Sequence, residues 1–226
     1  MLRFVRNMNG WQDPDTYEAS SWKLGTPRGE HVRKRRLEAV LRLLRGTESL
    51  LDVGAGPATL SQDFPCEVIA CDSGAAMLAK AKLRVHDAIR CDARYLPVRA
   101  GSFDVAFESS CLYLLKDKSA MVKEMCRVAR SLVIVFESNR LSVRRLYDKH
   151  VKGSEMSPEH PTPSEVKRYI AEAGLFPKIQ MVGFSPLFGG GVLLRIWKPI
   201  EWLVERLPVL RNFAGGILAY AHVDKR

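Results

Sequence analysis

The chain has 226 residues, 46% of them hydrophobic, and its 35 Lys and Arg outnumber its 25 Asp and Glu to give a formal net charge of +10. This length and apolar content exclude an intrinsically disordered chain and favour one α/β domain with added segments. The five cysteines include no C-x-x-C pair, the five histidines have no zinc-binding spacing, and the first residues show no signal-peptide pattern. We therefore expect buried free thiols, no metal site and a cytoplasmic location.

The first 46 residues predict an arm followed by a helix. The turn-forming sequence Asp13-Pro14-Asp15 lies among polar and aromatic residues of the segment 1–26, which predicts a loop with one short helix. Apolar residues recur at helical spacing over 30–44, and Gly46 ends that helix.

Residues 50–60, Leu-Leu-Asp-Val-Gly-Ala-Gly-Pro-Ala-Thr-Leu, predict a buried strand, a glycine-rich turn and a helix over 58–63. Gly54 and Gly56 allow the backbone to turn sharply and a ligand to approach it closely, and the start of the helix would offer free N–H groups. Two glycines are also found in tight strand-to-helix turns that bind no ligand. This motif is therefore weak evidence by itself.

Acidic residues recur where the next predicted strands end. The strands predicted over 66–71, 88–91 and 102–107 are each followed by an acid, in order Asp72, Asp92 and Glu108. The carboxyl ends of parallel strands meet at the edge where open α/β sheets bind ligands. An acid after the second strand, as at Asp72, can accept hydrogen bonds from both hydroxyls of a ribose.

The remainder of the chain continues the alternation of helices and strands. Helices are predicted over 75–84, 118–128, 140–152 and 165–173, and strands over 131–136, 175–184 and 216–223. Thr162 or Ser164 is suited to cap the helix over 165–173, and Gly174 to end it.

Four of these motifs together resemble the S-adenosylmethionine-dependent methyltransferases of the Rossmann-like class, and most closely the type 11 group that includes quinone-biosynthesis C-methyltransferases. They are Asp52-x-Gly54-x-Gly56, Asp72 followed by Met77-Leu78, Cys91-Asp92-Ala93 with Leu96-Pro97, and Ser102-Phe103-Asp104. The resemblance covers roughly residues 28–175. It implies an α/β fold with a doubly wound, mostly parallel seven-stranded sheet, a last strand that is antiparallel, and helices on both faces.

The resemblance also implies S-adenosyl-L-methionine as the cofactor. In the family the first acid and the glycines border the methionine part of the cofactor, the second acid holds the ribose, and the third approaches the adenine amine. The cofactor-binding residues it implies here are Asp52, Gly54, Ala55, Gly56, Asp72, Ser73, Met77, Asp92, Ala93 and Glu108.

Three positions depart from the family pattern. Ala58 stands where a glycine is common, Gly74 stands where a serine is frequent, and Leu112-Tyr113-Leu114 stands where many relatives have a histidine. No catalytic histidine is therefore carried over. The candidates for a general base are Tyr113, His150 and His160, each of which can equally be a packing or surface residue.

Two rival phosphate- or dinucleotide-binding motifs fit less well. A nicotinamide or flavin site requires glycine where this chain has Thr59, and a Walker loop is excluded because no Gly-Lys-Ser/Thr follows the turn. The sequence after the fourth strand, Ser109-Ser110-Cys111, also lacks the Asn-Pro-Pro-Tyr of enzymes that methylate exocyclic or glutamine nitrogens.

The excess positive charge lies outside the predicted core. Basic against acidic residues number 10 to 5 over 1–46, 5 to 1 over 139–152 and 6 to 3 over 195–226, but 11 to 12 over 47–138. Segments that cap a methyltransferase core shape its acceptor site, so the charge predicts an acidic acceptor, RNA or an anionic membrane surface. The alternative is a set of solvated helix faces.

Residues 184–210 interleave apolar and aromatic side chains with cations. This pattern predicts an interfacial helix or an apolar acceptor tunnel, with packing on the sheet or on a dimer mate as the alternative. No run approaches the roughly 18 uninterrupted apolar residues of a transmembrane helix.

We expect a single methyltransferase domain over 1–226. It comprises an N-terminal arm and helix (1–46), a cofactor-binding core (47–184), an amphipathic insertion (185–214) and a final strand (215–226). The expected activity is S-adenosylmethionine-dependent methyl transfer to a small apolar or anionic acceptor, with peripheral contact to an anionic membrane surface or RNA. The alternatives are an RNA methyltransferase that uses the basic segments and a non-catalytic cofactor-binding protein. The acceptor atom, the base and the oligomeric state are left open.

Overall fold

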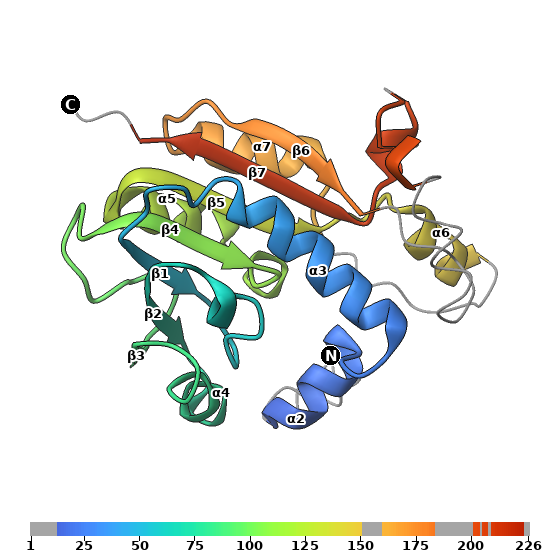
Figure 1. Cartoon of the computed structure of the whole chain (residues 1–226). Coiled ribbons are helices and arrows are strands. Elements are labelled where there is room, and N and C mark those ends of the chain that lie inside the picture. The colour runs from blue at the N-terminus through green and yellow to red at the C-terminus, as the bar shows by residue number, and fades with distance from the viewer. Residues whose placement is uncertain (1–12, 151–159, 184–200, 204, 208, 224–226) are drawn as a thin grey trace.

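The computed structural model describes residues 13–150, 160–183, 201–203, 205–207 and 209–223 (Figure 1). Its helical elements are α2 (Pro14–Tyr17), η2 (Glu18–Trp22), α3 (Pro27–Leu41), η3 (Ser61–Asp63), α4 (Ala75–Ala81), η4 (Leu112–Leu114), α5 (Lys118–Val128), α6 (Val143–His150), α7 (Pro163–Glu172) and η5 (Leu210–Phe213). Its strands are β1 (Ser49–Val53), β2 (Glu67–Asp72), β3 (Asp87–Arg90), β4 (Phe103–Ser109), β5 (Ala129–Ser138), β6 (Lys178–Val182) and β7 (Gly216–His222).

The seven strands form one sheet in the order β3-β2-β1-β4-β5-β7-β6. Strands β1 to β5 pair in parallel, and β7 runs antiparallel to both of its neighbours, β5 and β6. The predicted doubly wound sheet with an antiparallel last strand is therefore confirmed.

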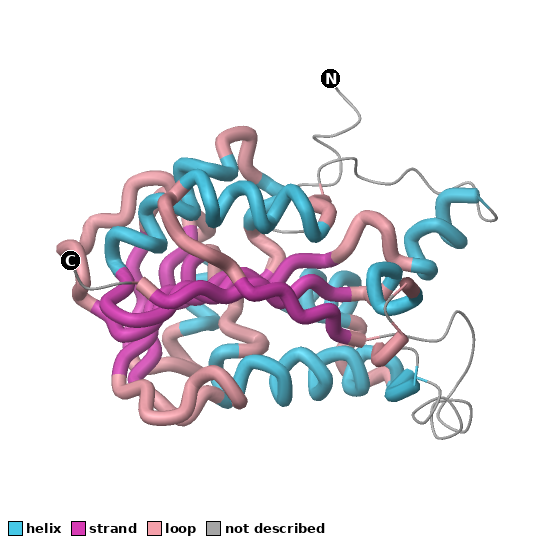
Figure 2. Tube along the Cα trace, turned by 90° about the horizontal axis from the view of Figure 1, so that it is seen from above, coloured by secondary structure: helices cyan, strands magenta, loops and turns pink. Residues whose placement is uncertain are grey.

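Helices cover both faces of the sheet (Figure 2). Alternate side chains of a strand point to opposite faces. In β5, Ile134 and Phe136 belong to the core under α3, whereas Val133 and Val135 pack under α5 and α7. Because both faces are covered, the central strands are apolar on both sides, as is typical of parallel sheets.

Local capping explains two helices that the sequence predicted closely. The carboxylate of Asp117 accepts a hydrogen bond from the N–H of Ala120 at 3.0 Å and starts α5 at the predicted residue. Thr162 and Glu165 form a capping box at the start of α7, and Gly174, with a φ of +83°, follows its end.

The predicted helix over 58–63 is wrong. Ala58 has a φ of +57°, in the left-handed region, so it cannot begin a right-handed helix. The chain makes only the short 3-10 turn η3 at Ser61–Asp63. The glycine-rich turn after β1 is therefore longer than the pattern indicates, and no helix start follows it directly.

Other predicted elements are shorter than expected. The basic helix predicted over 140–152 begins at Val143, and the strand predicted over 175–184 spans Lys178–Val182. Residues 184–200, the first part of the predicted amphipathic segment, lie outside the described residues, as do 151–159. The arm, α6 and the red segment of residues 201–213 all lie at the end of the molecule where the parallel strands finish (Figure 1).

Candidate active site

The turn after β1 is tied to the end of β2 by its own backbone. The N–H groups of Gly54 and Ala55 both donate to the carbonyl of Cys71, at 2.8 and 3.0 Å, and that of Gly56 donates to Asp72 Oδ2 at 2.9 Å. The N–H groups of these three turn residues are therefore used within the fold, and the helix that was expected to offer free N–H groups after the turn is replaced by η3.

The two glycines of the turn have different roles. A Cβ on Gly54 would lie 2.1 Å from the sulfur of Cys111, so only glycine fits against that side chain. A Cβ on Gly56 would meet only Tyr17 Cε1, at 3.8 Å. Gly54 therefore allows close packing with the loop after β4, whereas the space beside Gly56 is open toward Tyr17.

Asp52 and Asp72 end β1 and β2 at this turn. Asp52 is buried and accepts a hydrogen bond from the Ser61 hydroxyl at 2.5 Å, and burial raises its pKa to about 7. Asp72 also accepts the N–H of Gly74 at 2.8 Å on its other oxygen. Each carboxylate oxygen of Asp72 can accept a further hydrogen bond, so it fits the ribose role that the resemblance implies.

The other two expected acids lie in contrasting surroundings. Asp92, after β3, is half-exposed and forms a bidentate pair with Arg94, and these hydrogen bonds lower its pKa to about 2. Glu108, near the end of β4, is fully buried, and burial raises its pKa to about 7. One oxygen of Glu108 accepts the N–H of Cys111 at 3.1 Å, while Oε1 has no hydrogen-bond partner among the described residues.

The N-terminal arm packs over the glycine turn and α4. The buried carboxylate of Glu18 accepts hydrogen bonds from Thr59, Lys80 and Arg84, at 2.8, 2.6 and 2.5 Å. Burial alone would raise the pKa of Glu18, but these bonds lower it to about 2. The arm is thus held to the cofactor edge by an ion-pair cluster, and it carries Tyr17 to the space beside Gly56.

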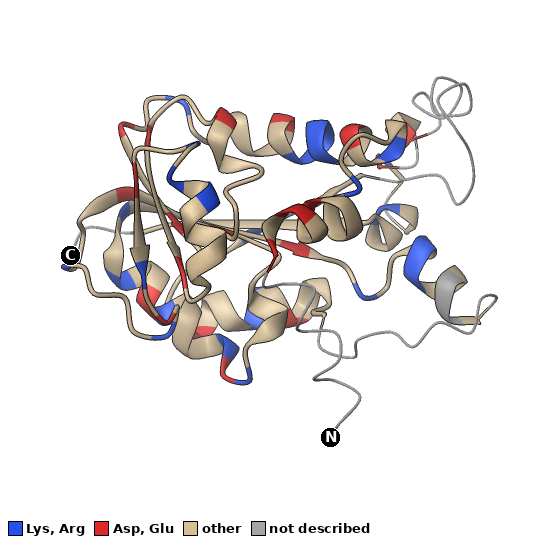
Figure 3. Cartoon of the chain, turned by 90° about the horizontal axis from the view of Figure 1, so that it is seen from below, with Lys and Arg blue, Asp and Glu red and all other residues tan. Residues whose placement is uncertain are grey.

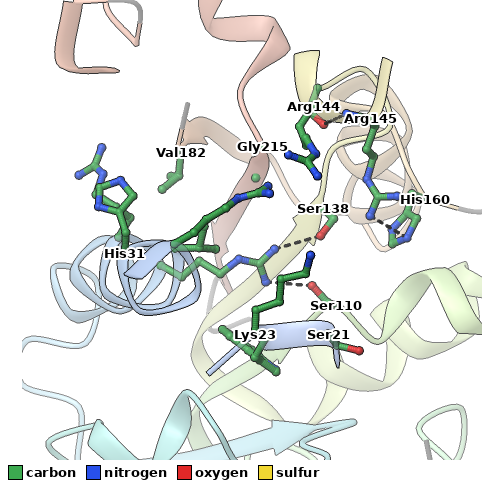
Figure 4. Close-up of a pocket in the computed structure, with 18 of the residues that line it drawn as sticks. Ser21, Lys23, His31, Ser110, Ser138, Arg144, Arg145, His160, Val182 and Gly215 are labelled. Carbon is green, nitrogen blue, oxygen red and sulfur yellow. Dashed lines mark hydrogen bonds between the residues drawn. The ribbon is translucent and has the colours of Figure 1, made fainter. Parts of the chain in front are cut away.

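A cavity of about 430 Å³ lies beyond the ends of β4, β5 and β7. Its described walls come from the arm, α3, the loop after β4, α6 and the turn before β7 (Figure 4). Six cations line it, against the single acid Glu201. They are Lys23, Arg28, Arg35, Arg36, Arg144 and Arg145. Lys23 and Arg144 point into the cavity from different walls (Figure 4), and the basic residues of α3 and α6 lie at the same end of the molecule (Figure 3).

Arg36 joins the ends of two neighbouring strands inside this cavity. Its NH1 donates to the hydroxyl of Ser110 at 2.9 Å and its NH2 to that of Ser138 at 3.0 Å, the two bonds drawn in Figure 4. The guanidinium also lies over the rings of Trp22 and Phe136, at 5.5 and 4.8 Å. Burial lowers the pKa of Arg36, and no direct acid pair neutralises it among its described contacts.

Two buried carboxyls lie behind Arg36. Glu137 is fully buried and accepts the N–H of Tyr113 at 3.3 Å, and burial and the neighbouring Glu108 raise its pKa well above the usual value. Because both carboxyls titrate above their ordinary range, they only partly offset the charge of Arg36.

A family model described as a methyltransferase domain matches residues 51–136, the segment that contains most of β1 and β5, all of β2 to β4, and the four acids Asp52, Asp72, Asp92 and Glu108. This match, on the sheet described above, supports a class I S-adenosylmethionine-dependent methyltransferase. Its cofactor is S-adenosyl-L-methionine. No curated protein gives a significant match to this methyltransferase.

Solved structures share its fold at low sequence identity. A methyltransferase of Thermotoga maritima, described as a possible histamine N-methyltransferase, has a TM-score of 0.63 at 16% identity and covers 98% of this chain and 97% of its own. The magnesium protoporphyrin IX methyltransferase of Synechocystis PCC 6803, solved with bound SAH, has a TM-score of 0.63 at 13% identity over 88% of this chain and 86% of its own. An Aquifex aeolicus methyltransferase has a TM-score of 0.59 at 17% identity over 94% and 99%. At these identities the likeness shows the fold alone.

The remaining residues implied by the resemblance lie at or beneath the cofactor edge. Ala55 and Ala93 are half-buried in the turns after β1 and β3. The carbonyl of Ser73 accepts a hydrogen bond from Arg90 at 3.0 Å, and Met77 is buried at the start of α4 beside Gly74. Gly74 is the N-cap of α4 and gives it no side-chain hydrogen bond.

Two of the three candidate bases line the cavity, and His150 does not. His150 is exposed at the end of α6. Tyr113 and His160 stack with ring centroids 4.0 Å apart. Burial raises the pKa of Tyr113, and burial together with Arg145 and Arg36 lowers that of His160 to about 3. At neutral pH the phenol therefore stays protonated and the imidazole is only a weak proton acceptor.

The sequence reading missed Arg36, Ser110 and Ser138. Arg36 lies in the basic run 33–36, which predicts either a solvated face or an anion site. The spacing of the sequence could have distinguished Arg36 from its neighbours. Val32, Arg36 and Val40 are four residues apart, so they lie on the same, inward-facing side of α3. Lys34, on the other side, is 75% exposed.

Proposed function

We propose that this methyltransferase transfers the methyl group to a small anionic acceptor that binds in the cationic cavity. The observation that carries the proposal is a pair of cations in its described lining, Lys23 and Arg36, with which no described acid forms an ion pair. Arg35, by contrast, pairs with Glu201 at 3.5 Å and with Glu205 at 2.6 Å. A carboxylate or phosphate on the acceptor would pair with Lys23 and Arg36.

The position of the cavity relative to the cofactor edge supports this assignment. Tyr17 lines the cavity and also lies beside Gly56. Cys111 packs against Gly54, and the residues on either side of it in the loop, Ser110 and Tyr113, line the cavity. The acceptor would therefore lie next to the glycine turn, separated from it by one layer of side chains.

When bound, the cofactor would supply a methyl group on a sulfonium sulfur, which would keep the electrons of the broken carbon–sulfur bond once the acceptor's electron pair forms the new bond to the methyl carbon. The residues of this chain hold and ionise the acceptor. Arg36 and Lys23 favour the deprotonated form of an acid or phenol beside them and so lower its pKa. An acceptor that is already ionised needs no strong base, which agrees with the unreactive protonation states of Tyr113 and His160.

We also propose that the enzyme works in the cytoplasm. All five cysteines are described and free, and Cys71 is buried in β2 beside the cofactor edge. Unpaired thiols suit a reducing compartment.

The test is methyl transfer from labelled S-adenosylmethionine to a cell extract that has been separated into anionic, neutral and cationic fractions. We expect label in the anionic fraction, and label confined to neutral or cationic material would overturn the proposal. With the acceptor in hand, Lys23→Gln and Arg36→Lys are expected to raise its KM about fivefold or more, with cofactor affinity unchanged. Lys34→Gln, an exposed cation on α3, is the matched control.

A further inference from the structure

Residues 201–214 turn their acidic side chains toward the protein. Glu201 is buried against His31 and Arg35 of α3. Glu205 accepts hydrogen bonds from Arg35 at 2.6 Å and from the N–H of Gly183 at 2.8 Å. The polar side of this segment is thus occupied by the fold itself.

The apolar side of the same segment faces outward. Trp202 is 57% exposed, Leu203 53% and Val209 71%, and Leu207 and Leu210 are exposed beside them. This is the reverse of a surface helix, which buries its apolar stripe and exposes its charges. A group of exposed apolar residues of this kind marks a binding surface.

The segment is held firmly to the sheet. The side-chain amide of Asn139, which is buried at the end of β5, donates to the carbonyls of Asn212 and Ala214 at 2.8 and 2.9 Å. The exposed apolar residues are therefore presented on an anchored base, and the same segment supplies Glu201 and Phe213 to the wall of the cavity.

Cations surround the apolar residues. The guanidinium of Arg206 lies 3.6 Å above the ring of Trp202. Arg206 and Arg211 also line a groove of about 570 Å³ together with Arg42 and Lys167, where the acid is Glu205. Aromatic and aliphatic side chains flanked by arginine and lysine complement the interface of an anionic bilayer, in which rings lie at the head-group level and cations bind phosphates.

We propose that the described residues between 201 and 214 dock on an anionic lipid bilayer, and that the acceptor is the anionic head group of a lipid in that bilayer. The second part rests on the proposed function. The docking surface comprises Trp202, Leu203, Arg206, Leu207, Val209, Leu210 and Arg211. No helix in the described ranges combines the length and apolarity needed to cross a bilayer.

The test is sedimentation of the full chain with phosphatidylcholine vesicles that contain either no anionic lipid or about one third phosphatidylglycerol. We expect binding to the anionic vesicles alone, weakened by salt, and a loss of tenfold or more in the partition coefficient for Trp202→Ser/Leu203→Ser. Phe176→Ser is the matched control, because Phe176 is 93% exposed but precedes the start of β6, whereas Glu205 of the docking segment contacts Gly183 after the end of that strand. Equal binding of both variants would overturn the docking surface.

The same preparations distinguish this inference from the proposed function. Label in a lipid extract, retained by an anion exchanger, supports both. Label only in water-soluble anions, with no vesicle binding, overturns the docking and leaves the proposed function intact. Vesicle binding with label confined to neutral lipids overturns the anionic acceptor and leaves the docking intact. A dimer lost on Trp202→Ser/Leu203→Ser, or salt-sensitive binding to RNA, without vesicle binding overturns the docking in favour of that partner.

Discussion

The carboxylate of Asp72 accepts the backbone N–H of Gly56 at 2.9 Å, which joins the end of β2 to the glycine turn after β1. Its second oxygen holds the N–H of Gly74 at the start of α4. One side chain therefore fixes both loops between which the cofactor ribose is expected to lie. These two backbone hydrogen bonds set the orientation of the Asp72 carboxylate. They leave one further lone pair on each oxygen to accept a hydrogen bond from a ligand.

We expect Asp72→Ala to weaken S-adenosylmethionine binding by about 100-fold or more, because it removes charge-assisted bonds to two ribose hydroxyls and frees the turn. Calorimetric titration measures the change. The control is Asp87→Ala, which removes an exposed acid at the start of β3. Unchanged affinity in Asp72→Ala would contradict the ribose assignment, and binding of NADH in place of S-adenosylmethionine would contradict the cofactor.

Glu18 determines whether the N-terminal arm stays closed over the cofactor edge. Glu18→Ala leaves Lys80 and Arg84 without their shared acid, so we expect about tenfold faster protease cleavage of the arm and faster release of the cofactor. The pKa of Glu18 is lowered from 4.5 to about 2. Its contribution to stability is therefore complete above pH 4.5 and is lost as the pH falls through about 2.

The matched control for the arm is Asp15→Ala. Asp15 also lies 2.5 Å from Lys80, but its side chain is 83% exposed, and an exposed pair contributes little. Limited proteolysis between pH 5 and 8 should show a constant, slow rate for the wild type and for Asp15→Ala. Cleavage of Glu18→Ala at the same slow rate would show that the arm is held by other contacts.

The sequence predicted the sheet well, because apolar runs and the acids that follow them are local signals. It failed at Ala58, where the left-handed backbone is imposed by tertiary contacts. The carbonyl of the next residue, Thr59, accepts a hydrogen bond from Arg33, and its hydroxyl donates to Glu18, both from distant parts of the chain. No local pattern encodes those partners.

The cationic cavity could be predicted only as an excess of charge. Its lining comes from segments that are far apart in the sequence, such as Lys23, Arg36, Ser138 and Arg145. Their convergence depends on how the arm, α3 and α6 pack at the end of the sheet. The distribution of charged residues along the sequence predicts that the excess positive charge lies outside the core. Only the packed structure distinguishes the cations that line the cavity from those, such as Lys34, that face solvent.

Gly54 tests the close packing between the turn and the loop after β4. Gly54→Ala combines a φ of +69° with a Cβ 2.1 Å from Cys111 Sγ, so we expect a loss of about 3 kcal/mol or more in unfolding free energy. Gly101→Ala has a φ of +60° but open space, so it should cost about 1 to 2 kcal/mol from the backbone alone. Denaturant unfolding measures both, and equal losses would contradict the steric role of Cys111.

Glu108 makes the stability of the fold depend on pH. Its pKa is raised by burial from 4.5 to about 7, so its contribution to stability is complete below pH 4.5 and is lost as the pH rises through about 7. Glu108→Gln stays neutral at every pH. The variant should therefore gain in Tm relative to the wild type between pH 4.5 and 7, and hold that gain above pH 7.

The control is Glu67→Gln, which changes an exposed residue at the start of β2 and should leave the dependence of Tm on pH as it is in the wild type. Circular dichroism measures Tm at each pH. If Tm depends on pH in the same way in Glu108→Gln and in the wild type, the Glu108 carboxyl ionises at no cost in the folded state.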